Sequence, residues 1–72
     1  MSRYVVSKSG TFGTVDRTYT TDAGVRVGLI RWGTLGWLSP VPEADCKQLA
    51  SRYESEAKDE ARAWVRAQEE TR

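Results

Sequence analysis

The sequence contains no histidine and a single cysteine, Cys46. One cysteine cannot form a disulfide within the chain, and without histidine it leaves no set of ligands for a structural zinc ion. The side chain that most often serves as a general base beside a nucleophile is also missing. We therefore expect no metal site, no cofactor and no enzymatic activity.

Long apolar runs and strongly charged segments are also absent. No stretch of about 18 apolar residues is present and Met1 is not followed by a charged and then apolar leader, so we expect neither a membrane span nor a signal peptide. Residues 1–42 carry five basic and two acidic side chains, and residues 43–72 carry six and eight, which gives the net charge of +1. Neither part has the clustered basic patch typical of nucleic-acid-binding proteins. A cytoplasmic location is expected.

Strand signals fill the first half of the chain. Apolar side chains alternate along residues 25–32, which is the period of a β-strand. Residues 33–36 (GTLG) supply glycines that tolerate a positive φ angle at a tight turn, after which an extended run resumes. Pro40 and Pro42 cannot donate hydrogen bonds to a sheet, so this strand is expected to end near Ser39.

Two further strand-prone segments, residues 4–6 and 11–19, precede this region. Gly13 lies inside the second one, and a glycine in a strand usually marks a bulge or a close backbone approach. We therefore expect a bent second strand. Turn residues at 22–24 lead into the strand that follows, so four strands in an antiparallel meander are the simplest arrangement.

From Pro42 the composition changes to Ala, Glu, Lys, Arg and Gln, without glycine or further proline. This composition predicts one long helix over residues 42–68. One face of that helix is apolar and consists of Cys46, Leu49, Ala50, Tyr53, Ala57, Ala61, Trp64 and Ala67. On this face Cys46 is interpreted as a buried small hydrophobic residue rather than as a reactive thiol near a helix N-terminus.

These patterns together predict an α+β fold. Four short antiparallel strands form a bent sheet or small barrel over residues 1–41, and one long amphipathic helix follows over residues 42–72 as part of the same domain. A chain of 72 residues buries only about 60% of the surface that its unfolded form exposes. Without a disulfide or a metal, association with another chain is the remaining way to gain stability.

The expected helix is longer than the sheet it packs on. It spans about 40 Å at 1.5 Å per residue, whereas four strands at a spacing of about 4.8 Å are only about 15 to 20 Å across. The far end of the apolar face therefore needs another partner, and we predict a homodimer through Tyr53, Ala57, Ala61 and Trp64. The alternative is a broader sheet in which Trp64 belongs to the core.

Residues 13–41 resemble part of the Src-homology-type small β-barrels and their Tudor and KOW relatives. The segment 33–41 (GTLGWLSPV) resembles the distal turn and following strand of those barrels, and Gly13 with the two residues after it resembles the glycine of their second strand. The resemblance implies a small barrel whose aromatic groove binds proline-rich or methylated peptides, or whose surface contacts nucleic acid.

The predicted function is a non-catalytic protein-protein interaction module that self-associates through its helix. Trp32 and Trp37 are candidates for a groove that binds a protein partner, although both also suit a structural role in so small a chain. The alternative is a small nucleic-acid-binding protein. Its candidate contacts are Arg17, Arg26 and Arg31.

Overall fold

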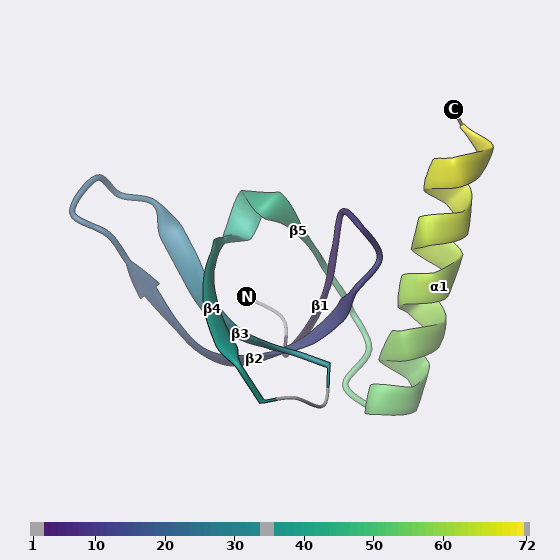
Figure 1. Cartoon of the computed structure of the whole chain (residues 1–72), viewed down its shortest axis with the longest axis horizontal. Coiled ribbons are helices and arrows are strands. Elements are labelled where there is room, and N and C mark those ends of the chain that lie inside the picture. The colour runs from purple at the N-terminus through teal and green to yellow at the C-terminus, as the bar shows by residue number, and fades with distance from the viewer. Residues whose placement is uncertain (1–2, 34–35, 72) are drawn as a thin grey trace.

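The computed structural model of the protein describes residues 3–33 and 36–71. Within them the chain folds into a curved, open antiparallel sheet of five strands followed by one C-terminal α-helix (Figure 1). The α+β class predicted from the sequence is therefore confirmed. In chain order the elements are β1 (Tyr4–Ser7), β2 (Phe12–Thr20), β3 (Arg26–Trp32), β4 (Leu38–Pro42), the short 3-10 helix η1 (Glu43–Asp45), β5 (Cys46–Gln48) and α1 (Glu54–Glu70).

The first four strands form the predicted meander, in which each strand pairs with the next. The strand order is β4-β3-β2-β1-β5 because the chain returns after η1 and places β5 along the free side of β1. The sequence predicts helix at residues 46–48, and this is wrong. Pairing with β1 overrides the local helical composition, because it provides partners for backbone groups of β1, as in the bond from the Leu49 N–H to the Tyr4 carbonyl at 3.0 Å.

The helix α1 begins at Glu54 rather than at Pro42. It has 17 residues, so it is about 25 Å long at 1.5 Å per residue, and not the longer rod that the sequence predicts. The predicted division at residues 41 and 42 therefore moves, because β5 and a loop separate the meander from α1. In the described part of the chain, no helix has the length and hydropathy that a membrane span requires.

The strand β4 continues through Pro40 and Pro42 instead of ending near Ser39. It lies at the edge of the sheet and pairs only with β3, so its prolines leave the pairing with β3 intact. In the turn before β4, Gly33 and Gly36 have φ angles of 61° and 78°, which confirms the predicted positive φ at these glycines; the two residues between them lie outside the described residues.

Gly13 allows the sheet to pack tightly against Trp32, its partner on β3. A Cβ atom at this position would lie 2.6 Å from Trp32 Cε3 and 2.6 Å from Ile30 Cγ2, so a larger residue would clash with both side chains. The bend predicted in this strand occurs farther along, at a bulge between Val15 and Arg17. Gly13 therefore marks a close approach and not the bulge.

The core lies on both sides of β1. Val5 and Val6 are fully buried although they point to opposite faces of the sheet. Val5 is paired with Gly13 and so shares the inner, concave face with Ile30 and Trp32. The outer face of β1 packs on α1 in a cluster formed by Tyr4, Val6, Leu49, Ala57 and Ala61, joined by Phe12, Trp64 and Val65.

The loop before α1 is fastened to the helix by Glu60. Its carboxylate accepts hydrogen bonds from the backbone N–H groups of Ala50 and Ser51 at 3.0 to 3.2 Å and from the Ser51 hydroxyl at 3.0 Å. These bonds hold the end of the sheet against the middle of α1.

Candidate functional site

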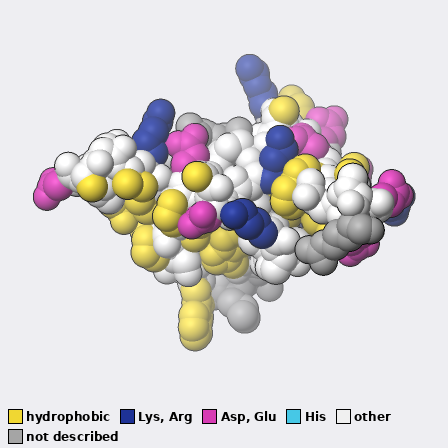
Figure 2. Space-filling model, turned by 90° about the horizontal axis from the view of Figure 1, so that it is seen from above, with side chains coloured by type: hydrophobic (Ala, Val, Ile, Leu, Met, Phe, Trp, Pro, Cys, Tyr) yellow, Lys and Arg dark blue, Asp and Glu magenta, His cyan; other side chains and the backbone are white. Residues whose placement is uncertain are grey.

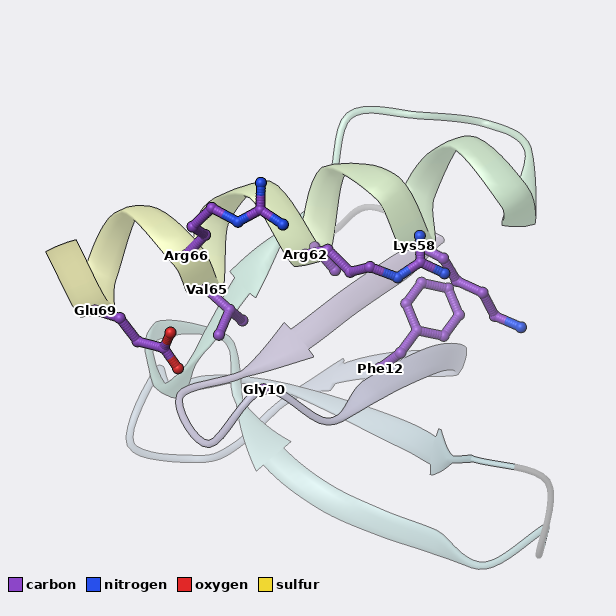
Figure 3. A pocket seen from close by; sticks show the side chains of 8 residues that line it. Gly10, Phe12, Lys58, Arg62, Val65, Arg66 and Glu69 are labelled. Carbon is purple, nitrogen blue, oxygen red and sulfur yellow. The ribbon is translucent and has the colours of Figure 1, made fainter.

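A groove lies between α1 and the turn that connects β1 to β2 (Figure 3). We call it the helix groove; its volume is about 420 Å³. One wall is formed by Gly10 and Phe12. The other is formed by residues of α1, namely Lys58, Ala61, Arg62, Val65, Arg66 and Glu69.

The apolar side chains at the base of the two walls form the floor of the helix groove. Phe12 is stacked on Tyr4 with ring centroids 5.5 Å apart, and Ala61 is buried beside it. Val65 points from α1 toward Gly10 (Figure 3), and a Cβ atom on that glycine would lie 3.5 Å from the Val65 methyl group. This distance is an ordinary van der Waals contact, so the turn lies against Val65 at one end of the floor, and the glycine itself is favoured by its positive φ angle of 95°.

Three cations follow each other along one flank of α1 at intervals of four residues: Lys58, Arg62 and Arg66. Lys58 Nζ lies 3.4 Å from Glu54 and 5.7 Å from the centre of the Phe12 ring. Arg62 and Arg66 therefore lie on the same flank one and two turns farther along.

The two arginines of this flank differ in their partners. Arg62 is paired with the exposed Asp59, whereas Arg66 forms no ion pair within the described residues and extends away from the sheet at the rim of the groove (Figure 3). The carboxylate of Glu69 lines the far end. The helix groove thus combines an apolar floor with a cationic rim that has one acidic end.

A second apolar surface lies on the outer side of β2, β3 and β4. Directly paired residues share a face of the sheet. On this rule the outward side chains are Leu29, Leu38, Pro40 and Tyr19, together with Arg17 and Arg31, which pair with Leu29 and Leu38. We call this the open sheet face. Tyr19 and Leu38 are 45% and 44% exposed, although Val27, the partner of Tyr19, is buried. The helix α1 packs on β1 and not on these strands (Figure 1).

The predicted self-association residues do not form one exposed surface. Ala57 and Ala61 are buried in the core of their own chain, so the prediction that they run past the sheet edge is wrong. The physical reason is the later start of α1, which brings its first two turns against β1. Trp64 is half-buried against the same cluster, whereas Tyr53 is 69% exposed at the N-cap position.

The two candidate groove tryptophans have different surroundings. Trp32 is half-buried and packs over Gly13, in the structural role that the sequence left open. Trp37, directly before β4, is 78% exposed. Only Trp37 therefore presents most of its indole ring to a partner.

The three candidate nucleic-acid contacts separate into two groups. Arg17 and Arg31 both approach the carboxylate of Asp16, at 3.6 and 3.8 Å. Arg26 lies elsewhere and pairs with Glu43 at 3.4 Å. On the face shown in Figure 2, lysine and arginine side chains are scattered among acidic ones instead of forming one patch.

Cys46 is part of β5 and not of a helix. Burial raises the pKa of its thiol, and the nearby carboxylates of Glu43 and Asp45 raise it further, against a hydrogen bond from Gln48 that lowers it. The raised pKa makes the thiol a poorer nucleophile at neutral pH. Within residues 3–33 and 36–71, no three potential metal ligands lie together.

The sequence analysis did not identify the helix groove. The four-residue spacing of Lys58, Arg62 and Arg66 was visible in the sequence as a cationic flank of a helix. The position of this flank beside Phe12 was not visible in the sequence, because it depends on how α1 crosses β1. Comparisons of this chain with protein families, with curated proteins and with solved structures find no match.

Proposed function

We propose that this chain is a non-catalytic protein-interaction module. The observation that carries the proposal is the open sheet face together with Trp37, whose indole is 78% exposed. Exposed aromatic and aliphatic side chains are typical of protein interfaces, and tryptophan is among the most frequent binding hot spots. Figure 2 shows hydrophobic side chains gathered over one part of the surface, with one of them projecting well beyond it.

Two features of the side chains support the non-catalytic part of the proposal. The chain has no histidine, and the pKa of its only thiol is raised by burial. The resemblance to Src-homology-type small β-barrels is also part of the proposal. It is supported by the curved antiparallel sheet and by the exposed aromatic side chain of Trp37, which follows Gly36.

Self-association remains part of the proposal, but through a different surface. Ala57 and Ala61 are buried, so the contact is assigned to Trp37 and the open sheet face. Two copies related by a two-fold axis would each cover the other's exposed apolar side chains. The mass in solution tests this. Trp37→Ser is expected to convert a dimer into a monomer, and Tyr53→Ser is the matched control, because Tyr53 is also an exposed aromatic residue. A parent that is monomeric at high concentration contradicts self-association.

Photo-crosslinking tests the interaction function itself. A benzophenone amino acid is placed at position 37, and at position 53 as the control, and the chain is irradiated in living cells. Protein adducts, including adducts of the chain with itself, are expected from position 37 and not from position 53. A Leu38→Glu substitution should abolish them, and adduct yields that do not differ between the two positions would contradict the proposal.

The second candidate function is nucleic-acid binding. The observation that favours it is the proximity of Arg17 and Arg31 at Asp16, beside the exposed ring of Tyr19. Binding through phosphates weakens steeply between about 50 and 200 mM salt, whereas an apolar protein contact does not. Nuclease-sensitive adducts from position 37, together with a steep salt dependence in a gel shift, would favour this candidate.

A further inference from the structure

We propose that the helix groove binds a short acidic segment of a partner protein, and that the segment seats one large apolar side chain on the groove floor. This inference rests on the proposed function as a protein-interaction module. It concerns a different surface from the open sheet face, so the two can be tested separately.

The size and lining of the helix groove set the kind of occupant. Its volume of about 420 Å³ lies in the usual range for binding pockets, about 300 to 1,000 Å³. The floor offers the ring of Phe12 and the methyl groups of Val65, which suit a phenylalanine or leucine side chain. A phosphate group would leave these apolar groups without a matching surface.

The rim selects for negative charge on both sides of that side chain. Arg66 forms no ion pair within the described residues. Lys58 and Arg62 pair with exposed carboxylates three or four residues away on the same helix, and Lys58 also lies over the Phe12 ring. Such exposed pairs contribute little to stability. All three cations can therefore turn to carboxylates of an incoming segment without a large loss elsewhere.

The same charges disfavour the other possible occupants. A two-fold axis through the cationic flank would set Arg62 and its neighbours against the same cations of a second copy, which is repulsive at short range. A nucleic-acid backbone needs a continuous track of cations, but Glu69 stands at the end of the groove and the chain as a whole carries a net charge of only +1.

Fluorescence anisotropy with defined peptides tests the proposal. The probe is a labelled, blocked heptapeptide in which one phenylalanine is flanked on each side by three acidic residues. The comparison peptides replace the phenylalanine with alanine or the acidic residues with lysine, and a labelled single-stranded oligonucleotide of similar charge is the fourth probe. The parent is expected to bind the first peptide at least about tenfold more tightly than any other probe.

Arg66→Glu is the central variant, because Arg66 is exposed and its replacement breaks no ion pair among the described residues. It should weaken binding of the acidic peptide about tenfold or more, and Arg62→Glu should do the same. The matched control is Arg17→Glu, which makes the same change in net charge outside the groove and should leave affinity unchanged within about twofold.

Three results would overturn the proposal. They are a lack of saturable binding of the acidic peptide, equal binding of the alanine peptide, and tighter Arg66-dependent binding of the oligonucleotide. None of them affects photo-crosslinking from position 37. Conversely, an acidic peptide that binds through Arg66 while position 37 yields no adducts would support the groove and contradict the role of the open sheet face.

Discussion

The two sides of the sheet are built differently. Around β1 both faces are covered, by α1 on the outside and by the concave interior on the inside, and Val5 and Val6 are fully buried. At β4 no residue is buried, and Leu38 is 44% exposed. A chain with a single helix can cover the outer face of only part of its sheet, so the side at β1 provides stability and the side at β4 remains available for binding.

A matched pair of leucine substitutions gives the strongest test of this difference. Leu49 is 1% exposed in the cluster between β1 and α1. Leu49→Ala should therefore lower the free energy of unfolding by about 2 to 5 kcal/mol, through lost burial and a residual cavity. Urea denaturation followed by tryptophan fluorescence measures this loss. In so small a domain, the variant can lose its cooperative transition altogether.

Leu38→Ala is the control, because it removes the same atoms from the exposed side of the sheet. We expect it to lower the free energy of unfolding by less than about 1 kcal/mol. Equal losses for Leu38 and Leu49 would mean that the outer face of β4 is covered in solution. Self-association through the open sheet face would then be the first explanation to examine, by repeating the denaturation at several protein concentrations.

A substitution on the concave face of the sheet should have an intermediate effect on the free energy of unfolding. Gly13→Ala places a Cβ atom 2.6 Å from both Trp32 and Ile30, which should cost about 1 to 3 kcal/mol of stability and shift the emission of the tryptophans. A smaller partner should relieve the clash, so Gly13→Ala combined with Trp32→Leu should show a favourable interaction energy in a double-mutant cycle. Strictly additive losses would contradict the packing of Trp32 over Gly13.

The same contrast explains which parts of the fold the sequence predicts. The meander follows from alternation and turn residues that act locally, as at residues 25–32 and 33–36. The strand β5 is not predicted by such local signals. Residues 46–48 have a helical composition and become a strand only by pairing with β1, which is distant in sequence. Because residues 46–48 are predicted as helix, the predicted helix begins at Pro42 instead of Glu54, and Ala57 and Ala61 are predicted on the surface instead of in the core.

The candidate sites show the same limit. Trp37 and Trp32 are equivalent in the sequence, and only the packing of Trp32 over Gly13 separates a structural indole from an exposed one. The cationic flank at Lys58, Arg62 and Arg66 is encoded locally by the helical repeat. Its apolar floor is not, because Phe12 reaches it from another element. Local periodicity therefore predicts which side chains share a face, and long-range packing decides what that face meets.

The smallest expected effect concerns the hydrogen bonds by which Glu60 of α1 holds the loop at Ala50 and Ser51. The hydrogen bond from the Ala50 N–H lowers the pKa of the Glu60 carboxyl from its ordinary value of 4.5, helped by the bonds from Ser51 and by the charge of Lys47, while desolvation opposes the shift. Because the folded state has the lower pKa, Glu60 stabilises the fold fully above pH 4.5. This contribution disappears as the pH falls through the lowered pKa.

Glu60→Gln should therefore reduce the free energy of unfolding at pH 7 by less than about 1 kcal/mol, since the carboxylate is partly exposed and is screened by solvent. The difference from the parent should vanish in acid below the lowered pKa, and denaturation at a series of pH values measures it. Glu56→Gln is the control, because this exposed carboxylate on the same helix has no hydrogen bond within the described residues. If both variants gave the same pH profile, the effect would belong to the general charge of α1, and the fastening of the loop at Ala50 and Ser51 would contribute nothing to stability.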